Sequence, residues 1–161
     1  LDLSDDAVAP IREAYAKITA KDSAENWMAV KVSGDGNKLE QSGSGTGGVN
    51  ELTAAFGSDD SAVQFGVLKV VAKDDQNSNR AKLIFITYVG PSVPVMKKAR
   101  VSVTKDSVAG VFGGIQIFFE LEKDGFDQLV GDISKKMIAS GGAHKPNAYD
   151  FGGGVLHELE K

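Results

Sequence analysis

Cysteine is absent from the 161 residues of the chain, and its absence excludes several kinds of chemistry. Disulfide bridges, thiolate nucleophiles and cysteine-bound zinc are ruled out, and the composition suits a reducing compartment. Long apolar runs are missing too, because none approaches the ~18 residues that a membrane-spanning helix needs. The N-terminus also lacks a basic segment followed by an apolar one. We therefore expect a cytoplasmic protein that does not span a membrane.

Catalytic and metal-binding patterns are scarce. The two histidines, His144 and His157, lie in a Gly-rich C-terminal segment, and no nucleophile elbow accompanies them. Adjacent acidic pairs at residues 59–60 and 74–75 lack the further oxygen ligands of a calcium loop. We interpret both pairs as surface acids in turns, and we expect no enzyme activity, no cofactor and no metal.

Positive charge is not in excess, since the formal net charge is -4 and the isoelectric point is near 5.2. Nucleic-acid binding usually requires a basic domain, so nucleic acid is excluded as a partner. The composition, 42% hydrophobic and 25% charged, is that of an ordinary globular domain. We expect one monomeric domain over residues 1–139, followed by a flexible Gly-rich tail over residues 140–161.

Apolar residues near the N-terminus recur with the period of a helix. Val8, Ile11, Tyr15 and Ile18 follow one another at spacings of three and four, which places them on one buried stripe. Ser4 precedes two aspartates and is typical of a helix N-cap followed by an acidic first turn. The sequence therefore predicts that an amphipathic helix opens the domain.

The rest of the chain alternates strand and helix patterns separated by turn residues. We expect strands over residues 26–32, 38–42, 62–72, 82–89 and 115–121, and helices over residues 49–56, after Pro94 and over residues 126–138. The first two strands should form a hairpin, and residues 74–79 should form the loop between the central strands. This order predicts an α/β fold of the α+β type, with a mixed sheet flanked by helices on both faces. Trp27 is interpreted as a core aromatic residue.

A Gly-rich loop at residues 43–48 satisfies the G-x-G-x-x-G pattern of dinucleotide-binding folds. That pattern binds phosphate only inside a βαβ unit with a parallel first strand. The strand before this loop is instead the second arm of a predicted antiparallel hairpin. We therefore interpret the loop as a flexible turn, and a small nucleotide-binding enzyme is a remote alternative.

One long segment departs from the acidic character of the chain. From Arg80 to Lys105 no acidic side chain occurs, although Lys98 and Lys105 are among several cations there. Pro94 suits the first turn of a helix, where its missing N–H is not needed. Local basicity on an acidic chain indicates a directional contact with an acidic partner.

The same helix carries apolar residues on two sides. Met96, Ala99 and Val103 recur at helical spacing, and we expect this stripe to face the sheet. Val101 and Val108 should then project outward between the cations. Such a mixture of cations and aliphatic groups is typical of a protein-docking face, and the competing interpretation is a solvated basic surface.

Several segments, taken in order, resemble the actin-depolymerising-factor homology superfamily. Its long actin-binding helix, with the strand and acidic turn that follow, is similar to KKARVSVTKDSVAGVFGGIQIFFELEKDGFD. Coactosins, the filament-binding branch, are similar to SGSGTGGVNEL, AVQFGVLKV, RAKLIFITYVG and the late SGGA and NAYDFGGG, so the resemblance covers nearly the whole chain. It implies a five- or six-stranded sheet between two pairs of helices.

The resemblance also implies which residues contact actin. A lysine at the turn entering the fourth strand is central to filament binding in coactosins, and it matches Lys82, with Arg80 at the neighbouring basic position. The other implied actin contacts are Lys97, Lys98, Arg100, Lys105, Lys135 and Lys136. In place of a further cation usual in coactosins, this chain has Asn79.

The leading hypothesis is a non-enzymatic protein of the cytoplasm and cytoskeleton that binds the sides of actin filaments and modulates capping or filament dynamics. A cofilin-like depolymerising protein that also binds monomeric actin is the alternative within the superfamily. A binder of acidic phospholipid headgroups, using the same cations, is a third interpretation.

Overall fold

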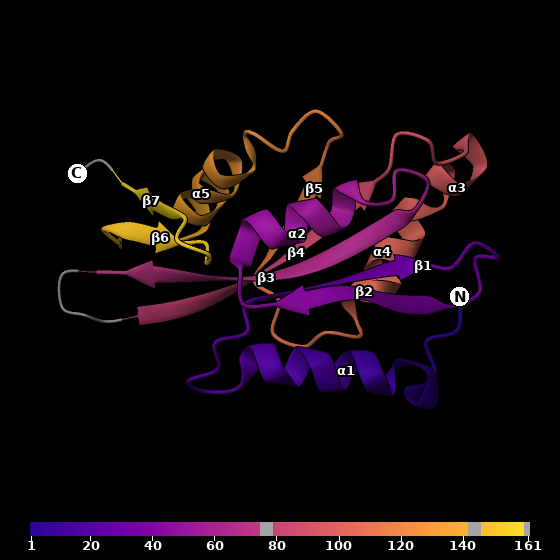
Figure 1. Cartoon of the computed structure of the whole chain (residues 1–161), viewed down its shortest axis with the longest axis horizontal. Coiled ribbons are helices and arrows are strands. Elements are labelled where there is room, and N and C mark those ends of the chain that lie inside the picture. Colours follow the sequence, from indigo (N-terminus) through magenta and orange to yellow (C-terminus); the bar gives the residue numbers. More distant parts are fainter. Residues whose placement is uncertain (75–78, 142–145, 160–161) are drawn as a thin grey trace.

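The structure is a computed structural model of the chain, and it describes residues 1–74, 79–141 and 146–159. A mixed sheet forms the middle of the molecule (Figure 1). Its strands are β1 (Trp27–Val32), β2 (Leu39–Gly45), β3 (Val63–Lys73), β4 (Asn79–Val89), β5 (Ile117–Leu121), β6 (Ala148–Asp150) and β7 (Leu156–Glu158). The helices are α1 (Asp5–Thr19), α2 (Gly48–Gly57), α3 (Val95–Ala99), α4 (Val101–Ala109) and α5 (Leu129–Ser140).

The strands follow the order β2-β1-β3-β4-β5, and β6 and β7 extend the sheet beside β3. The β4–β5 pair is parallel, while β1–β2, β1–β3, β3–β4, β3–β6 and β6–β7 are antiparallel. The predicted mixed sheet and the predicted β1–β2 hairpin are therefore confirmed. The main path has five strands, and the two C-terminal strands raise the total in the described residues to seven, above the five or six that the resemblance implied.

Helices cover both faces of the sheet, as the sequence predicted. Figure 1 shows α2 and α5 on one side and α1 on the other. Each side has its own core: Leu52 and Ile133 pack with Trp27 on the first, and Val8 and Val108 pack with Phe65 on the second. The sheet therefore separates two apolar layers, each closed by helices.

The predicted stripe of α1 is buried, and the helix begins at the expected position. Ser4 occupies the N-cap position, but its side chain makes no capping bond, and its N–H donates to Asp2 Oδ1 at 3.0 Å. At the other end of α1, the Lys69 ammonium of β3 donates to the carbonyl oxygens of Ile18, at 3.1 Å, and Ser23, at 3.0 Å. This pair of bonds joins the helix to the centre of the sheet, and burial lowers the pKa of Lys69.

The C-terminal segment differs from the prediction of a flexible tail beginning at residue 140. β6 pairs with the far half of β3, and β7 pairs with β6. Tyr149 and Phe151 are buried in the core beside α2 and α5. Residues 152–154 are glycines with positive φ, so they make the reversal between the two strands. The glycines suggested a flexible tail, whereas burial of the two aromatic side chains holds the described part of this segment on the sheet.

Candidate functional site

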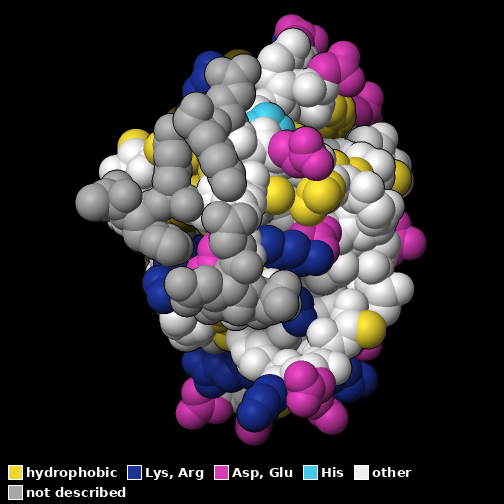
Figure 2. Space-filling model, turned by 90° about the vertical axis from the view of Figure 1, so that its left-hand side faces the viewer, with side chains coloured by type: hydrophobic (Ala, Val, Ile, Leu, Met, Phe, Trp, Pro, Cys, Tyr) yellow, Lys and Arg dark blue, Asp and Glu magenta, His cyan; other side chains and the backbone are white. Residues whose placement is uncertain are grey.

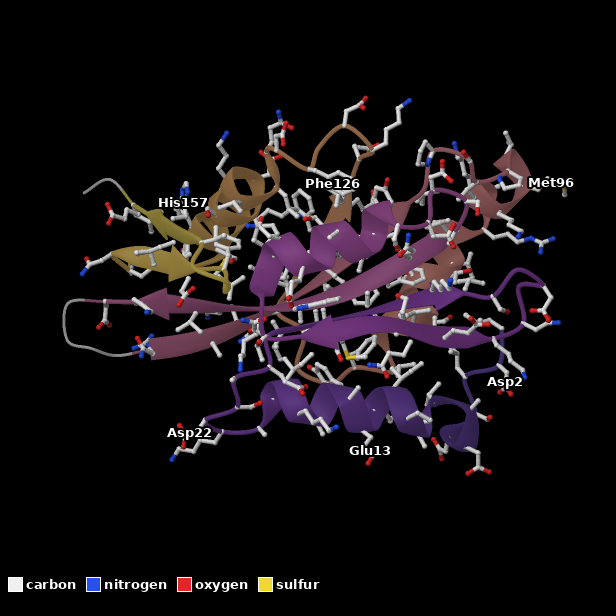
Figure 3. The ribbon with its side chains drawn as sticks, viewed as in Figure 1. Asp2, Glu13, Asp22, Met96, Phe126 and His157 are labelled. Carbon is white, nitrogen blue, oxygen red and sulfur yellow. The ribbon has the colours of Figure 1, made fainter. Side chains whose placement is uncertain are left out.

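Five residues of α3, of α4 and of the junction between them form an exposed surface that is both apolar and basic. The side chains of Val95, Met96 and Val103 are 79%, 73% and 74% exposed. Lys98 and Arg100 lie among them, and neither side chain makes a hydrogen bond or ion pair with the described residues. We call these five residues the α3–α4 surface, and Figure 3 shows Met96 at the end of the molecule formed by α3. Exposed apolar groups beside free cations are features of a protein-docking site.

This surface uses a different side of the helix from the one predicted. Met96, Ala99 and Val103 were expected to face the sheet, but all three are exposed. Val101 and Val108 were expected to project outward, but Val108 is completely buried and Val101 packs against the same core. The prediction of an outward aliphatic surface on a basic helix stands, but the residues that form it were assigned the wrong way round.

The helix is interrupted at Arg100, and the apolar residues after the interruption lie on both sides of it. The Arg100 N–H donates to the Lys97 carbonyl oxygen, three residues back, at 3.2 Å, so the predicted long helix is two short helices. Val101, Val103 and Val108 make both sides of α4 apolar, and periodicity alone does not choose between them.

Two of the three predicted contact lysines between residues 97 and 105 are already bound within the molecule. The Lys97 ammonium donates to the Gly34 carbonyl oxygen, in the turn between β1 and β2, at 3.0 Å. The Lys105 ammonium forms an ion pair with the Glu120 carboxylate of β5. The hydrogen bond to Glu120 raises the pKa of Lys105. Both contacts are exposed, so they orient the cations without removing them from reach of a partner.

The edge of the sheet at β5 brings Lys105 and Lys136 together. Both line a hollow of about 450 Å³ with Phe118, Phe119 and Glu120. The Lys136 ammonium donates to the Phe118 carbonyl oxygen at 2.7 Å and lies 5.8 Å from the centre of the Phe119 ring. The Phe118 side chain is 54% exposed, and sequence reasoning missed it. The signal was present, because alternation along this strand places neighbouring phenylalanines on opposite faces of the sheet.

Lys82 lies inside β4 and not at the turn before it. The strand begins at Asn79, and Lys82 stands opposite Val70 while Arg80 stands opposite Ala72 of β3. Being two residues apart, Arg80 and Lys82 point to the same face of the sheet. Neither side chain has a hydrogen bond or ion pair among the described residues. Residues 75–78 of the predicted loop lie outside them.

The predicted contact residues do not form one patch. Arg80 and Lys82 line a cavity of about 100 Å³ with Met137 and Tyr149, on the side of the sheet that carries α5. The opposite end of the long axis carries α3 (Figure 1). Figure 2 views the molecule from the end opposite α3, where Lys and Arg side chains lie beside exposed hydrophobic ones. Lys135 is exposed on α5. A partner that contacts every predicted residue must therefore extend along the molecule.

The Gly-rich loop at residues 43–48 has the hydrogen bonds of a structural turn. The Gly47 N–H donates to Glu51 Oε1 and the Gly48 N–H donates to Asn26 Oδ1, each at 2.8 Å. β2 contains the first three residues of this segment, and it is antiparallel to β1. Amide groups that already bind a carboxylate and a side-chain amide are not free to surround a phosphate. The interpretation as a turn is favoured over a dinucleotide site.

The remaining candidate ligands lie apart. Asp59 forms an ion pair with Lys31 at 3.5 Å, and His157 lies in β7. His144 and Asp75 lie outside the described residues. Within the described ranges, no three His, Asp or Glu side chains are grouped to hold a metal ion. Over the same ranges, no helix combines the length and apolar character needed to cross a membrane.

Comparison with known proteins gives the class of this fold. The family described as cofilin/tropomyosin-type actin-binding protein matches residues 6–134. This chain belongs to that family of actin-binding proteins.

Named relatives place the chain beside one branch of the family. Coactosin of Dictyostelium discoideum is 32% identical over 124 residues, which cover 76% of this chain and 83% of that protein. The crystal structure of coactosin from Entamoeba histolytica superposes with a TM-score of 0.71 at 24% identity, covering 83% of this chain and 94% of the other. Mouse coactosin, described as an actin filament binding protein, gives a TM-score of 0.60 at 19% identity, covering 85% and 91% of the two chains. The predicted fold and family are thereby confirmed.

Proposed function

We propose that this protein binds the sides of actin filaments, without catalysis, and thereby modulates capping or filament dynamics in the cytoplasm. The observation that carries the proposal is the α3–α4 surface, where three exposed apolar residues lie among cations that have no side-chain partner in the described part of the chain. The chain belongs to a family of actin-binding proteins. The similarity to coactosins supports the choice of the filament as the partner.

In this proposal, the charged and the apolar side chains of the α3–α4 surface have different roles in binding. Lys98 and Arg100 would approach acidic groups of actin and orient the encounter, because complementary charge mainly increases the association rate and fixes the register. Met96 and Val103 would supply the contact that excludes water. Lys82 and Arg80, at the other end of the molecule, would form a second contact.

Co-sedimentation with actin filaments tests this proposal. The protein should pellet with filaments, and pelleting should fall as salt rises, since exposed charges are screened over about 10 Å at 0.1 M ionic strength. The double variant Lys98→Glu, Arg100→Glu should lose most of the binding. The matched control Lys17→Glu, Lys21→Glu makes the same charge change near the end of α1 and should bind like the parent.

Three parallel measurements separate the alternatives. Equal or tighter binding to monomeric actin would favour a cofilin-like protein over a filament-side binder. Binding to vesicles with acidic phospholipids, but not to filaments, would favour the lipid interpretation. Saturable calorimetric binding of a dinucleotide, lost in Gly45→Val, would favour an enzyme. Any of these results, without salt-sensitive pelleting, contradicts the proposal.

A further inference from the structure

Ser102 precedes Val103 of the α3–α4 surface, and its hydroxyl group has no hydrogen-bond partner among the described residues. It is an exposed residue in the first turn of α4. Its hydroxyl makes no hydrogen bond with the described residues, whereas Thr104 Oγ1 donates to the Arg100 carbonyl oxygen and Ser107 Oγ donates to the Val103 carbonyl oxygen. Among the hydroxyl residues of α4, Ser102 is therefore the one that offers a free oxygen atom.

The residues before Ser102 form a basic recognition sequence. Lys97, Lys98 and Arg100 precede it by five, four and two positions, and Lys105 follows it by three. Protein kinases select substrates largely by the pattern of charge around the acceptor hydroxyl. A row of cations on the N-terminal side, with no acidic residue among them, suits a kinase whose substrate groove is acidic.

The structure also allows this segment to leave the surface. α3 buries no side chain, and Val95 and Met96 are among the most exposed apolar residues of the protein. The Lys97 bond to the Gly34 carbonyl oxygen is exposed. Segments with few buried contacts open locally at low free energy. Residues 94–100, which carry the cations before Ser102, can therefore detach into the groove of another protein, while α4 stays on the core with Ser102 exposed in its first turn.

We propose that Ser102 is phosphorylated by a kinase that prefers basic substrates, and that the phosphate opposes binding at the α3–α4 surface. The Ser102 oxygen forms a bond to the γ-phosphorus of ATP, the bond from that phosphorus to the β–γ bridging oxygen breaks, and the hydroxyl proton leaves as ADP is released. The product carries about -1.5 to -2 charges at neutral pH, which would offset Lys98 and Arg100. The regulatory part rests on the proposed function.

The first experiment tests the modification alone. The full chain is incubated with ATP, magnesium and a kinase that prefers basic substrates, and the product is mapped by mass spectrometry. One phosphoryl group is expected on Ser102, with no incorporation in Ser102→Ala and at least a tenfold slower reaction in Arg100→Ala. No incorporation into the parent, or a phosphate carried mainly by another residue, would overturn the assignment.

The second experiment compares phosphorylated and mock-treated protein on actin filaments. At least a tenfold weaker binding is expected, with an unchanged or higher melting temperature, because a phosphate in the first turn of a helix complements its dipole. Ser102→Glu should weaken binding, whereas Ser107→Glu, which adds the same charge beside Asp106 on the same helix, should weaken it less.

The outcomes of the second experiment separate the two proposals. Phosphorylated protein that binds like the mock-treated protein overturns the regulation and leaves filament binding intact. A mock-treated protein that does not pellet overturns the proposed function and the regulation that rests on it, while the mapped phosphate still decides whether Ser102 is the acceptor.

Discussion

The lysine side chains of this protein differ in whether they form a hydrogen bond or ion pair within the molecule. Lys97 and Lys105 bind the Gly34 carbonyl oxygen and the Glu120 carboxylate, whereas Lys82 has no side-chain partner among the described residues. A side chain without an internal partner can be replaced with little effect on folding. Its replacement therefore reports on binding alone.

Lys82→Ala should weaken filament binding and leave folding nearly unchanged. We expect a change in unfolding free energy of only about 0.5 kcal/mol. A central interface residue typically costs about 2 kcal/mol or more in binding free energy. Thermal melting and co-sedimentation of the same preparation separate the two effects. Lys21→Ala is the control, because Lys21 is exposed after α1. If Lys82→Ala melts and pellets like the parent, the contact lies elsewhere, with Lys98 the next candidate.

Glu51 has the opposite character, since its role is structural. Its Oε1 accepts hydrogen bonds from the Trp27 indole N–H and the Gly47 N–H, both at 2.8 Å. Glu51→Ala leaves both donors without their acceptor, and we expect a loss of about 1–3 kcal/mol of unfolding free energy. Denaturant titration followed by Trp27 fluorescence measures it. Glu13→Ala, on the exposed side of α1, should have a much smaller effect, and equal effects would contradict the role assigned to Glu51.

At the scale of elements, the orientation of α4 determines which valines hold the fold and which are available to a partner. Val108 is fully buried against the core that α1 covers, while Val103 is 74% exposed. The two residues have the same chemistry and lie on one short helix. They therefore form a matched pair for testing the two roles.

Met96→Ser combined with Val103→Ser should weaken filament binding about tenfold, equal to ~1.4 kcal/mol, without loss of folding free energy. Val108→Ala should instead lower the unfolding free energy by about 2 kcal/mol, because it removes buried methyl groups. Denaturant titration and co-sedimentation of both variants make the comparison. A destabilised Met96→Ser, Val103→Ser variant and a stable Val108→Ala variant would show that α4 has the orientation first expected from its sequence.

Elements with one apolar face were predictable from sequence, and elements with two were not. The stripe of α1 from Val8 to Ile18 has one apolar side, and the helix lies where the pattern placed it. α4 has valines on both sides, so periodicity did not decide which side faces the core. The C-terminal strands were not predicted, because the three glycines at residues 152–154 suggested a flexible segment. They form the turn of a hairpin that is held on the sheet by the buried side chains of Tyr149 and Phe151.

The candidate site was predictable as a set of residue types and less so as an arrangement. The basic character of residues 80–105 is local in sequence and could be read directly. The contact of Lys97 with Gly34 joins positions 63 residues apart, and that of Lys105 with Glu120 joins positions 15 apart. Such partners follow from how the sheet and helices pack. Periodicity along one segment holds no information about them.

At the scale of the whole molecule, all three tyrosines respond to pH in the same direction. Burial raises the pKa of Tyr15, Tyr88 and Tyr149, and the nearby carboxylates of Asp60 and Asp124 add to the rise for Tyr88. In the unfolded chain each phenol ionises near its ordinary value, about 10. The stability from these raised pKa values is therefore complete below about pH 10 and is lost as the pH rises through the folded-state values.

Titration of the phenolate ultraviolet absorbance tests this expectation. The native protein should ionise at higher pH than the same protein in denaturant, and its unfolding free energy should fall above about pH 10. Tyr15→Phe should remove part of the difference. Native tyrosines that titrate with the denatured ones would contradict the burial described for all three.

The late position of β6 has a consequence for synthesis. β3 pairs with β1 along its first half and with β6 along its second, and the Val49 N–H of α2 donates to the Phe151 carbonyl oxygen at 3.0 Å. A ribosome delivers β3 and α2 long before it delivers β6 and Phe151. The emerging chain therefore exposes an unpaired edge and an open helix terminus, a state that favours pairing with other chains. Nascent protein should need protection from aggregation until the closing hairpin has left the exit tunnel.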